Sequence, residues 1–197
     1  LHLSLRRQRQ MCIRDRFLET YRSAREAGFD NINIDLMSAI PDQTYEGWIH
    51  NLRTVAGLDP EHISAYSLII EEGTPFASRT LKLPDEDTEY NMYEATAQIL
   101  GEYGFEQYEI SNYAKKGREC RHNVGYWIRQ DYLGFGLGAS SLYGKERFAN
   151  TQDMKKYLEN SRTPEKIREK ARRTLCRERG GLFDSRRAVS YTHLTLP

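Results

Sequence analysis

The segment at residues 31–37 combines the spacing of a β-strand with side chains that could hold a ligand. Apolar and polar residues alternate along it in the order Asn31-Ile32-Asn33-Ile34-Asp35-Leu36-Met37. A period of two is typical of a strand, and helical patterns on both sides predict a parallel strand covered by helices. The polar side must then face something other than helices. We expect it to face the interior of an α/β barrel, with Asp35 near the carboxyl end where such barrels carry their chemistry.

Each polar residue near this strand also has a structural interpretation. Asp35 could accept hydrogen bonds from a ligand, or it could cap the next helix or loop. Gln43 could be a second polar contact inside the barrel, or an amide that orders its own loop. His62 opens a second strand, and we interpret it as a buried histidine whose ring nitrogens are satisfied by protein groups. Gly134, Gly136 and Gly138 lack the spacing of a dinucleotide-binding turn, so tight backbone packing is the better interpretation.

The elements that position these residues follow from periodicity, capping residues and turn formers. A strand–helix–strand unit of about 30 residues begins at the first strand, which is the size of a βαβ crossover. In the helix at 87–103 we expect a buried stripe of Met92, Tyr93, Ala97, Leu100 and Tyr103. The expected elements are helices at 17–27, 44–56, 87–103, 154–160 and 164–172, strands at 31–37, 62–70 and 107–113, a long loop at 71–84, and a hairpin at 142–150 that turns at Gly144-Lys145.

Length, charge and cysteine usage limit the class of protein. The chain has 197 residues and a formal net charge of +1, which fits one domain, or one and a part, and gives no argument for a nucleic-acid partner. No apolar run approaches the ~18 residues of a membrane span, and no secretory signal is visible. The three cysteines are too far apart in sequence for a disulfide framework or a cysteine metal motif to be read. A cytoplasmic protein is expected.

The two ends of the chain share an unusual relationship. Arg7 to Asp15 can be encoded by a DNA segment whose reverse complement, read in register, encodes Val189 to Pro197. Folding does not account for two termini encoded by opposite strands of one DNA segment. We therefore expect translated adapter sequence at both tips, which removes Cys12 and His193 from consideration.

Several sequence blocks occur in order between residues 28 and 150 and carry a family resemblance. They are NIDLM at 33–37 with Pro41-x-Gln43-Thr44, HISAYSLIIEEGT at 62–74, QYEISNYA at 107–114, ECRHNVGYW at 119–127, and YLGFGLGAS at 132–140. Together they resemble the HemW-type heme chaperones, which are close relatives of the oxygen-independent coproporphyrinogen III oxidases in the radical S-adenosylmethionine superfamily. The resemblance covers about two thirds of the chain, and spaced blocks in order are more specific than one motif.

The resemblance implies an α/β fold, the C-terminal part of a (β/α)6 partial barrel followed by the beginning of a small C-terminal domain. In the family the barrel holds a [4Fe-4S] cluster and S-adenosylmethionine. The Cys-x-x-x-Cys-x-x-Cys loop that binds the cluster belongs upstream and is missing here. Cys120 and Cys176 cannot replace it, because such clusters need clustered thiolates. We therefore expect no radical chemistry from the chain as it stands.

A division of the chain follows from the resemblance. We expect adapter-derived sequence at 1–16, the second half of the barrel at 17–115, and a connecting region at 116–150. The C-terminal domain begins at 151–172, and 173–197 is of doubtful frame and ends in adapter sequence.

The resemblance also assigns candidate binding residues. Around S-adenosylmethionine it implies Asp35, Gln43, Tyr66 and Ser67, where Asp35 could bind ribose or amine groups. Packing is the alternative for Tyr66, because the family's segment approaches the adenine partly through its backbone.

The motif His122-Asn123-x-x-Tyr126 matches one that is linked to heme in the chaperone branch. A neutral imidazole is a common axial ligand of heme iron, and Tyr126 and Trp127 offer aromatic surface to a porphyrin. His122 is the possible iron ligand, with Cys120 as an alternative thiolate. The structural alternative is that His122 holds its turn through backbone hydrogen bonds.

Two functional classes remain open. One is a binding protein that holds heme and passes it to an apo-hemoprotein acceptor. The other is an enzyme that uses a 5′-deoxyadenosyl radical to convert propionate side chains of coproporphyrinogen III into vinyl groups. In either class the cofactors supply the chemistry and the protein orients them. The His-Asn-x-x-Tyr motif favours the first class.

Overall fold

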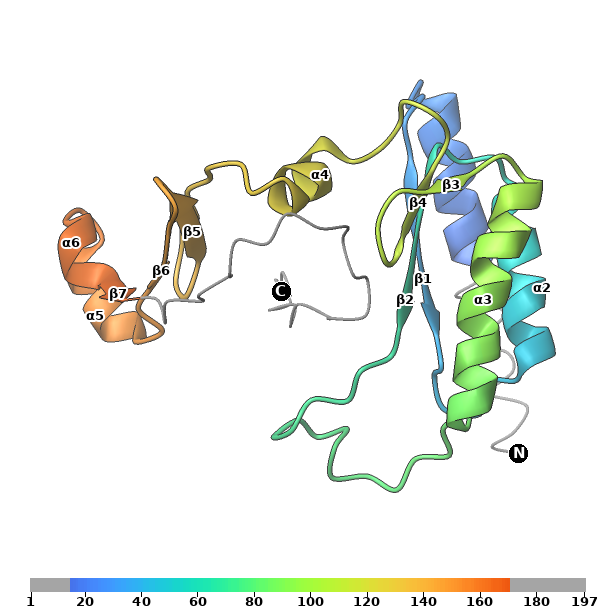
Figure 1. Ribbon diagram of the computed structural model, residues 1–197, viewed down its shortest axis with the longest axis horizontal. Coiled ribbons are helices and arrows are strands. Elements are labelled where there is room, and N and C mark those ends of the chain that lie inside the picture. Colours follow the sequence, from blue (N-terminus) through green and yellow to red (C-terminus); the bar gives the residue numbers. More distant parts are fainter. Residues whose placement is uncertain (1–14, 171–197) are drawn as a thin grey trace. The chain divides into compact units, whose positions relative to one another are not determined.

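The computed structural model describes residues 15–170. The chain divides into two compact units between Glu119 and Cys120, and each is described by itself (Figure 1). The expected adapter-derived tips, together with Cys176, lie outside the described residues apart from Asp15 and Arg16. The division into five segments that we expect from the sequence stays a prediction.

The first unit contains a mixed four-stranded sheet in the order β1-β2-β4-β3. Strand β1 (Asn33–Ser38) and strand β2 (His62–Ser67) are parallel, and helix α2 (Tyr45–Ala56) connects them. This is the predicted βαβ unit. Strand β4 (Asn112–Ala114) runs antiparallel to β2, and the short strand β3 (Glu106–Gln107) pairs with β4 at the edge. Helix α3 (Glu86–Glu102) precedes β3.

Local sequence sets the helix ends in this unit. The Thr44 hydroxyl accepts a hydrogen bond from the Gly47 amide at 3.1 Å, so Thr44 is the N-cap of α2. Asp85 caps α3 by accepting from the Thr88 amide at 2.7 Å, and acidic residues fill the first turn of that helix. The helix at residues 15–26 ends before Gly28, whose φ of +90° is the left-handed conformation that favours glycine at a helix end.

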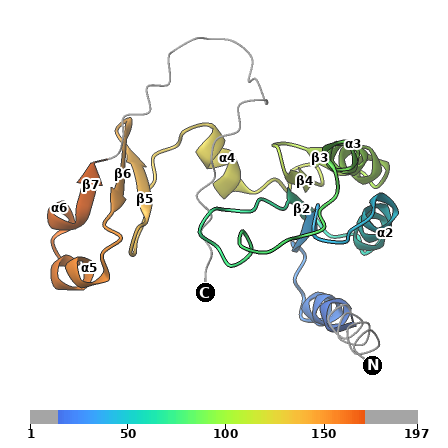
Figure 2. The ribbon, with the colours of Figure 1, turned by 90° about the horizontal axis from the view of Figure 1, so that it is seen from below.

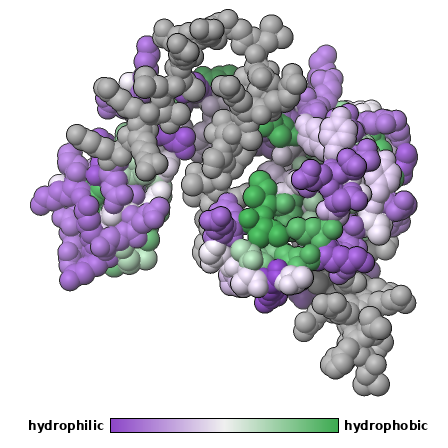
Figure 3. Space-filling view, turned by 60° about the horizontal axis from the view of Figure 1, so that its bottom comes forward, coloured by the Kyte–Doolittle hydropathy of each residue, from purple (hydrophilic) through white to green (hydrophobic). Residues whose placement is uncertain are grey.

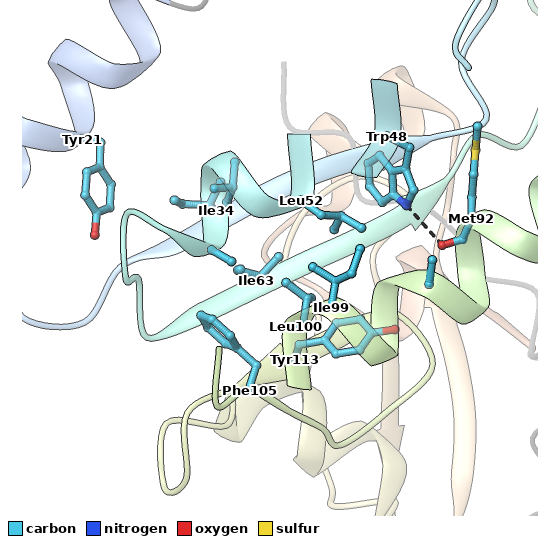
Figure 4. Close-up of a cluster of buried hydrophobic side chains, with 13 residues drawn as sticks. Tyr21, Ile34, Trp48, Leu52, Ile63, Met92, Ile99, Leu100, Phe105 and Tyr113 are labelled. Carbon is cyan, nitrogen blue, oxygen red and sulfur yellow. Dashed lines mark hydrogen bonds between the residues drawn. The ribbon is translucent and has the colours of Figure 1, made fainter. Parts of the chain in front are cut away.

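The helices lie on one face of the sheet (Figures 1 and 2). Side chains from that face and from the helices form one buried hydrophobic core (Figure 4). Its members are Tyr21, Ile34, Trp48, Leu52, Val55, Ala56, Ile63, Met92, Ala95, Ile99, Leu100, Phe105 and Tyr113. The apolar side of β1 therefore packs against helices, as its alternating pattern predicts.

Trp48 fixes α2 against α3 through a polar contact inside the core. Its indole Nε1 donates to the Thr96 hydroxyl at 2.9 Å and to the Met92 carbonyl at 3.1 Å. Because Trp48 is almost fully buried, an unpaired indole N–H there would be costly. The two acceptors on α3 thus set the position of α2 as well as satisfying the donor (Figure 4).

An ion pair ties the helix at 15–26 to the N-terminal end of the sheet. Arg25 and Glu61 form a salt bridge at 3.0 Å, and Glu61 also accepts from the Ile32 amide at 2.8 Å. Burial raises the pKa of Glu61, but the hydrogen bonds from Arg25 and Ile32 outweigh that effect and leave the pKa below its ordinary value. The carboxylate therefore stays charged and joins this helix to the entries of β1 and β2.

Three predictions for this unit are wrong in part. The expected single strand at 107–113 is a turn between β3 and β4, because residues 108–111 bend the chain back on itself and bring Tyr113 opposite Gln107. In α3, Met92 and Leu100 are buried as predicted, and Ala97 and Tyr103 are partly buried against the core. Tyr93 is instead 44% exposed, and the buried side of the helix also includes Ala95, Thr96 and Ile99. Strand β2 also ends at Ser67, before the predicted end at residue 70.

The second unit contains a three-stranded antiparallel sheet in the order β5-β6-β7. The predicted hairpin is confirmed: Gly144 and Lys145 both have positive φ between its strands, which matches the right-handed twist of a two-residue hairpin turn. Beyond residue 167 the predicted last helix is wrong, because the chain becomes extended and pairs with β6. The elements are α4 (Arg121–Trp127), β5 (Ser140–Tyr143), β6 (Glu146–Asn150), α5 (Met154–Asn160), α6 (Pro164–Ile167) and β7 (Arg168–Lys170).

The glycine-rich segment before β5 packs closely against that strand. A Cβ at Gly134 would lie 2.2 Å from the Ser140 carbonyl oxygen, so only glycine fits there. The Gly134 amide donates to the Ser141 hydroxyl at 3.0 Å. Tight backbone packing, as we predicted for these glycines, is confirmed at Gly134.

Shortening Leu52 in the core should destabilise the first unit. We expect Leu52→Ala to lower the free energy of unfolding by about 2–5 kcal/mol, because a fully buried leucine leaves a cavity. Leu83 is 42% exposed, so the matched variant Leu83→Ala should cost less than about 0.5 kcal/mol. Urea denaturation followed by far-ultraviolet circular dichroism measures both. Equal losses in the two variants would contradict the assigned core.

Candidate functional site

The face of the sheet opposite the helices carries polar side chains at matched positions of three strands. We call this the open face and define it by Asn33, Asp35 and Met37 of β1, His62, Ser64 and Tyr66 of β2, and Asn112 of β4. The parallel register places Asn33 beside His62, Asp35 beside Ser64, and Met37 beside Tyr66. The antiparallel register places Asn112 beside Ser64. Paired residues share a face, so Asp35, Ser64 and Asn112 form one row across the sheet.

A chain of hydrogen bonds crosses the open face near the N-terminal ends of β1 and β2. The Tyr108 hydroxyl lies 2.7 Å from His62 Nε2, and His62 Nδ1 lies 2.6 Å from Asn33 Oδ1. Asn33 Nδ2 in turn donates to Asp35 Oδ1 at 2.8 Å, and the Ser64 hydroxyl donates to Asn33 Oδ1 at 3.2 Å. His62 is therefore satisfied at both ring nitrogens, which confirms the sequence interpretation of this residue.

Burial controls the charge of His62. The side chain is only 5% exposed, and burial lowers the pKa of His62 below its ordinary value, although the carboxylates of Asp35 and Glu109 act in the opposite direction. A histidine with a lowered pKa is neutral at pH 7. It then carries one N–H donor and one acceptor nitrogen, which matches its two partners on the open face.

The turn between β3 and β4 completes the site beside β4. Glu109 accepts hydrogen bonds from the Ser111 amide at 3.0 Å and from Asn112 Nδ2. Asn112 is 4% exposed, and its Oδ1 has no hydrogen-bond partner within the described residues. A buried acceptor without a donor is costly, so this oxygen fits a site that receives a donor group from outside the sheet.

Near the C-terminal ends of β1 and β2, the open face is more apolar than near their N-terminal ends. Met37 and Tyr66 are 48% and 37% exposed, and they lie side by side in the register of β1 and β2. The segment after β2 adds the exposed side chains of Ile69 and Phe76. Figure 3 shows a hydrophobic area on the surface of this unit. The face therefore changes from polar at Asn33 and His62 to apolar at Met37 and Tyr66.

Gln43 and Ser67 lie beyond the strands at this end. Gln43 follows β1 in a loop where Ala39 and Asp42 have positive φ. Its Nε2 donates to the Met37 carbonyl at 3.4 Å, while its Oε1 is buried without a partner among the described residues. The amide nitrogen thus bonds the backbone near the end of β1, and a role of Gln43 in binding a ligand stays a prediction. Ser67 donates to Glu89 of α3, so its hydroxyl is directed to a helix rather than to the row at Asp35.

The described part of the second unit carries the other candidate group on α4. His122 and Tyr126 lie one turn apart, and their rings meet edge to face with centroids 4.6 Å apart. Tyr126 packs in the same manner on Tyr132, also at 4.6 Å, and the Tyr132 amide donates to the Leu142 carbonyl of β5 at 2.7 Å. Burial raises the pKa of Tyr126, so its phenol is neutral. The row of rings thus connects His122 to the sheet.

Exposed apolar side chains accompany this row in the sequence. Ile128, Leu133 and Phe135 are 69%, 52% and 88% exposed, whereas large apolar residues are usually covered in a folded domain. His122 itself is exposed at the first turn of α4. The segment 122–137 therefore presents an imidazole together with several exposed apolar groups.

The structure separates the candidate residues into two sets. Asp35 and Tyr66 belong to the open face, and Gln43 and Ser67 border it. His122, Asn123 and Tyr126 lie on α4 in the other unit. Whether these residues bind ligands stays a prediction. Between residues 15 and 170, no three histidine, cysteine or acidic side chains converge as ligands for a metal ion.

Sequence reasoning missed the partners that Asp35 has on the open face. Asn33 and Ser64 were visible as polar positions of the two strands, but their contacts depend on the register between β1 and β2. Tyr108 and Glu109 lie in the turn that we predicted as a strand. The one signal that pointed to these contacts was the polar alternation on both β1 and β2.

The fold defines a class of protein. The chain aligns with the solved structure "Coproporphyrinogen III oxidase (HemN) from Escherichia coli is a Radical SAM enzyme" at a TM-score of 0.59 and 23% identity, over 73% of this chain and 37% of that chain. This likeness establishes the fold and confirms the expected α/β class. No family model matches the sequence.

Curated relatives give the particular family. The chain is 42% identical over 144 residues to the heme chaperone HemW of Bacillus subtilis, covering 71% of this chain and 38% of that protein. It is 43% identical over 143 residues to HemW of Haemophilus influenzae, at 68% and 37% coverage. For HemW of Escherichia coli the values are 44% over 121 residues, at 61% and 31%. The aligned part of the chain is therefore related in sequence to the HemW-type heme chaperones.

The chain spans about a third of the length of these relatives. Within the described residues, no helix is long and apolar enough to cross a bilayer.

The lowered pKa of His62 predicts a specific pH dependence of stability. In the unfolded chain His62 takes up a proton as the pH falls through about 6.5, whereas the folded form resists protonation. The contribution of His62 to stability is therefore complete above that pH and is lost as the pH decreases below it. Urea midpoints measured between pH 7.5 and 5.0 should fall more steeply for the unaltered chain than for His62→Gln. Parallel slopes in the two proteins would contradict a depressed pKa.

Proposed function

We propose that this chain is part of a heme chaperone, a protein that binds heme and delivers it to an apo-hemoprotein acceptor. The curated relatives with 42–44% identity carry the name heme chaperone HemW, and this agreement is the observation that carries the proposal. In the intact protein a [4Fe-4S] cluster and S-adenosylmethionine accompany heme. A cytoplasmic location is part of the same proposal.

Heme is the cargo, and α4 offers the groups that suit it. An exposed imidazole at His122 can coordinate iron through a neutral nitrogen. Its packing on Tyr126 and, through that ring, on Tyr132 restricts how the imidazole can turn. The exposed apolar side chains at 128–137 are suited to the faces and edges of a porphyrin. Asn123 follows His122 on the same helix and is part of the proposed site.

S-adenosylmethionine suits the open face of the first unit. Asp35 can accept hydrogen bonds from the ribose hydroxyls or the amino group. The unpartnered Oδ1 of Asn112 adds an acceptor in the same row. Met37 and Tyr66 offer exposed apolar surface for the adenine ring. When bound beside a reduced cluster, S-adenosylmethionine supplies radical chemistry. The role of these side chains is to bind and orient it.

The cluster itself does not fit the residues at hand. Iron–sulfur clusters need several cysteine thiolates close together, and the described residues provide only Cys120 at the start of α4. No step of the proposed function is therefore assigned to a cluster held by this chain. Its own contribution lies in the open face and in α4.

A second candidate is an oxygen-independent coproporphyrinogen III oxidase, an enzyme of porphyrin biosynthesis. The shared fold with the Escherichia coli oxidase favours it, and both functions handle a tetrapyrrole. A full-length version of the protein separates the two functions. Heme binding without turnover of coproporphyrinogen III supports the chaperone, whereas turnover without heme binding supports the oxidase.

Heme binding by the chain can be measured directly. We expect a titration with hemin to shift the Soret band, and His122→Ala to weaken binding about tenfold or more, the equivalent of about 1.4 kcal/mol. His50 is an exposed histidine of α2 in the other unit, and the matched variant His50→Ala should bind like the unaltered chain. Equal binding by all three proteins would remove His122 as the iron ligand.

The open face can be tested with the cofactor alone. We expect S-adenosylmethionine to shift the amide resonances of β1 and β2 in heteronuclear NMR spectra, and Asp35→Asn to reduce those shifts, because an amide replaces the charged acceptor. Asp30 precedes β1 and is exposed, so Asp30→Asn serves as the matched control. Shifts that are the same in Asp35→Asn and in the unaltered chain would contradict the contact.

A further inference from the structure

We propose that Tyr108, His62 and Asn33 are positioning residues that hold the Asp35 carboxylate in one orientation on the open face. The role we assign to the carboxylate rests on the proposed function, in which Asp35 contacts S-adenosylmethionine. The hydrogen-bonded chain itself does not depend on that function. It is a property of the folded first unit and can be tested separately.

Hydrogen bonds connect the turn between β3 and β4 to β1 without a break. Each link lies between 2.6 and 2.8 Å, from the Tyr108 hydroxyl to His62, from His62 to Asn33, and from Asn33 to Asp35. These are short, well-formed hydrogen bonds. The rings of His62 and Tyr108 also meet edge to face, with centroids 5.6 Å apart. His62 is thus held through its ring face and both of its nitrogens.

Only one direction of donation satisfies every member. Asp35 is a carboxylate at pH 7 and can only accept, so Asn33 must present its NH₂ group to it and keep its Oδ1 toward His62. That oxygen accepts, so His62 Nδ1 must carry the proton. Because burial keeps His62 neutral, its Nε2 is an acceptor and Tyr108 donates to it. Donation therefore runs from Tyr108 through His62 and Asn33 to Asp35.

The surrounding groups keep this arrangement in place. The Ser64 hydroxyl gives Asn33 Oδ1 a second donor, which favours the same amide orientation. The Tyr108 amide donates to the Asn112 carbonyl at 3.2 Å, which closes the turn that carries the phenol. The charged groups that act on His62 are Asp35 of β1 and Glu109 of the turn, and neither can supply the proton at Nδ1. Hydrogen bonds in such a chain polarise one another, so a change at Tyr108 reaches Asp35.

One oxygen of Asp35 is thereby fixed, and the carboxylate presents its other oxygen in a defined direction. Asp35 is exposed on the open face, where a carboxylate without such a partner would rotate among several orientations. Restricting a binding group before the ligand arrives reduces the entropy lost on binding. This is what distinguishes a positioning role from a bond that serves the fold alone.

The experiment uses the whole chain labelled with ¹⁵N and ¹³C. Long-range ¹H–¹⁵N spectra at pH 7 report which nitrogen of His62 carries the proton, and we expect Nδ1. Tyr108→Phe removes the first donor but keeps the ring, so it should shift the Asn33 carboxamide signals and the Asp35 carboxyl carbon while the fold persists. Tyr93 of α3 receives a hydrogen bond from Gln107 on the helix-covered face, and Tyr93→Phe should leave both signals unchanged.

Each outcome decides the proposal. A proton on Nε2 of His62 in the unaltered chain would overturn it, and this measurement needs no variant that might unfold. An Asp35 carboxyl signal that does not respond to Tyr108→Phe, or that responds equally to Tyr93→Phe, would also overturn it. Titration with S-adenosylmethionine separates the existence of the hydrogen-bonded row from its role in cofactor binding. Loss of cofactor shifts in Tyr108→Phe supports the positioning role. In the remaining case, His62 carries its proton on Nδ1 and the Asp35 signal responds to Tyr108→Phe, but S-adenosylmethionine shifts no resonance in any of the proteins. That result would overturn the proposed cofactor site and the positioning role. The hydrogen bonds from Tyr108 to Asp35 would then serve the fold alone.

Discussion

Between residues 15 and 119, the helices cover one face of the β1-β2-β4-β3 sheet and leave the other without a helix (Figures 1 and 2). Most other features of the first unit follow from this constraint. The covered face is apolar and joins Ile34, Ile63 and Tyr113 to the helices in one core. The opposite face must satisfy its polar groups without helices. It does so through side-chain hydrogen bonds that run across the strands, from Tyr108 to Asp35. The same asymmetry leaves Met37 and Tyr66 exposed at one end of that face.

The two candidate sites use histidine in opposite ways. His62 is buried, neutral and bonded at both nitrogens, so it cannot take a metal ion without losing a partner. His122 lies exposed on a short helix, where aromatic packing restricts it. The local surroundings, rather than the residue type, suit His62 to the positioning role and His122 to the role of iron ligand that we propose for them.

The parts of the fold that local sequence controls were predictable. The helices at 17–27 and 44–56, the strand at 31–37 and the hairpin at Gly144-Lys145 were predicted, because each depends on neighbours in the sequence. The β3–β4 turn and β7 were not predicted, since short strands are decided by pairing with distant residues. For the same reason the sequence singled out Asp35 and a satisfied His62 but could not connect them. Their connection through Asn33 needs the register of β1 with β2.

The two edge strands of the first sheet differ in how much backbone they offer for pairing with another strand. Strand β3 has only two residues, and both of its side chains are polar, so it offers little backbone for another strand. Within the described residues β1 pairs only with β2, so the outer side of this six-residue strand has no strand partner there. The edge at β1 therefore offers a longer stretch of backbone than the edge at β3. A strand that paired with β1 would extend the open face on the side of Asp35.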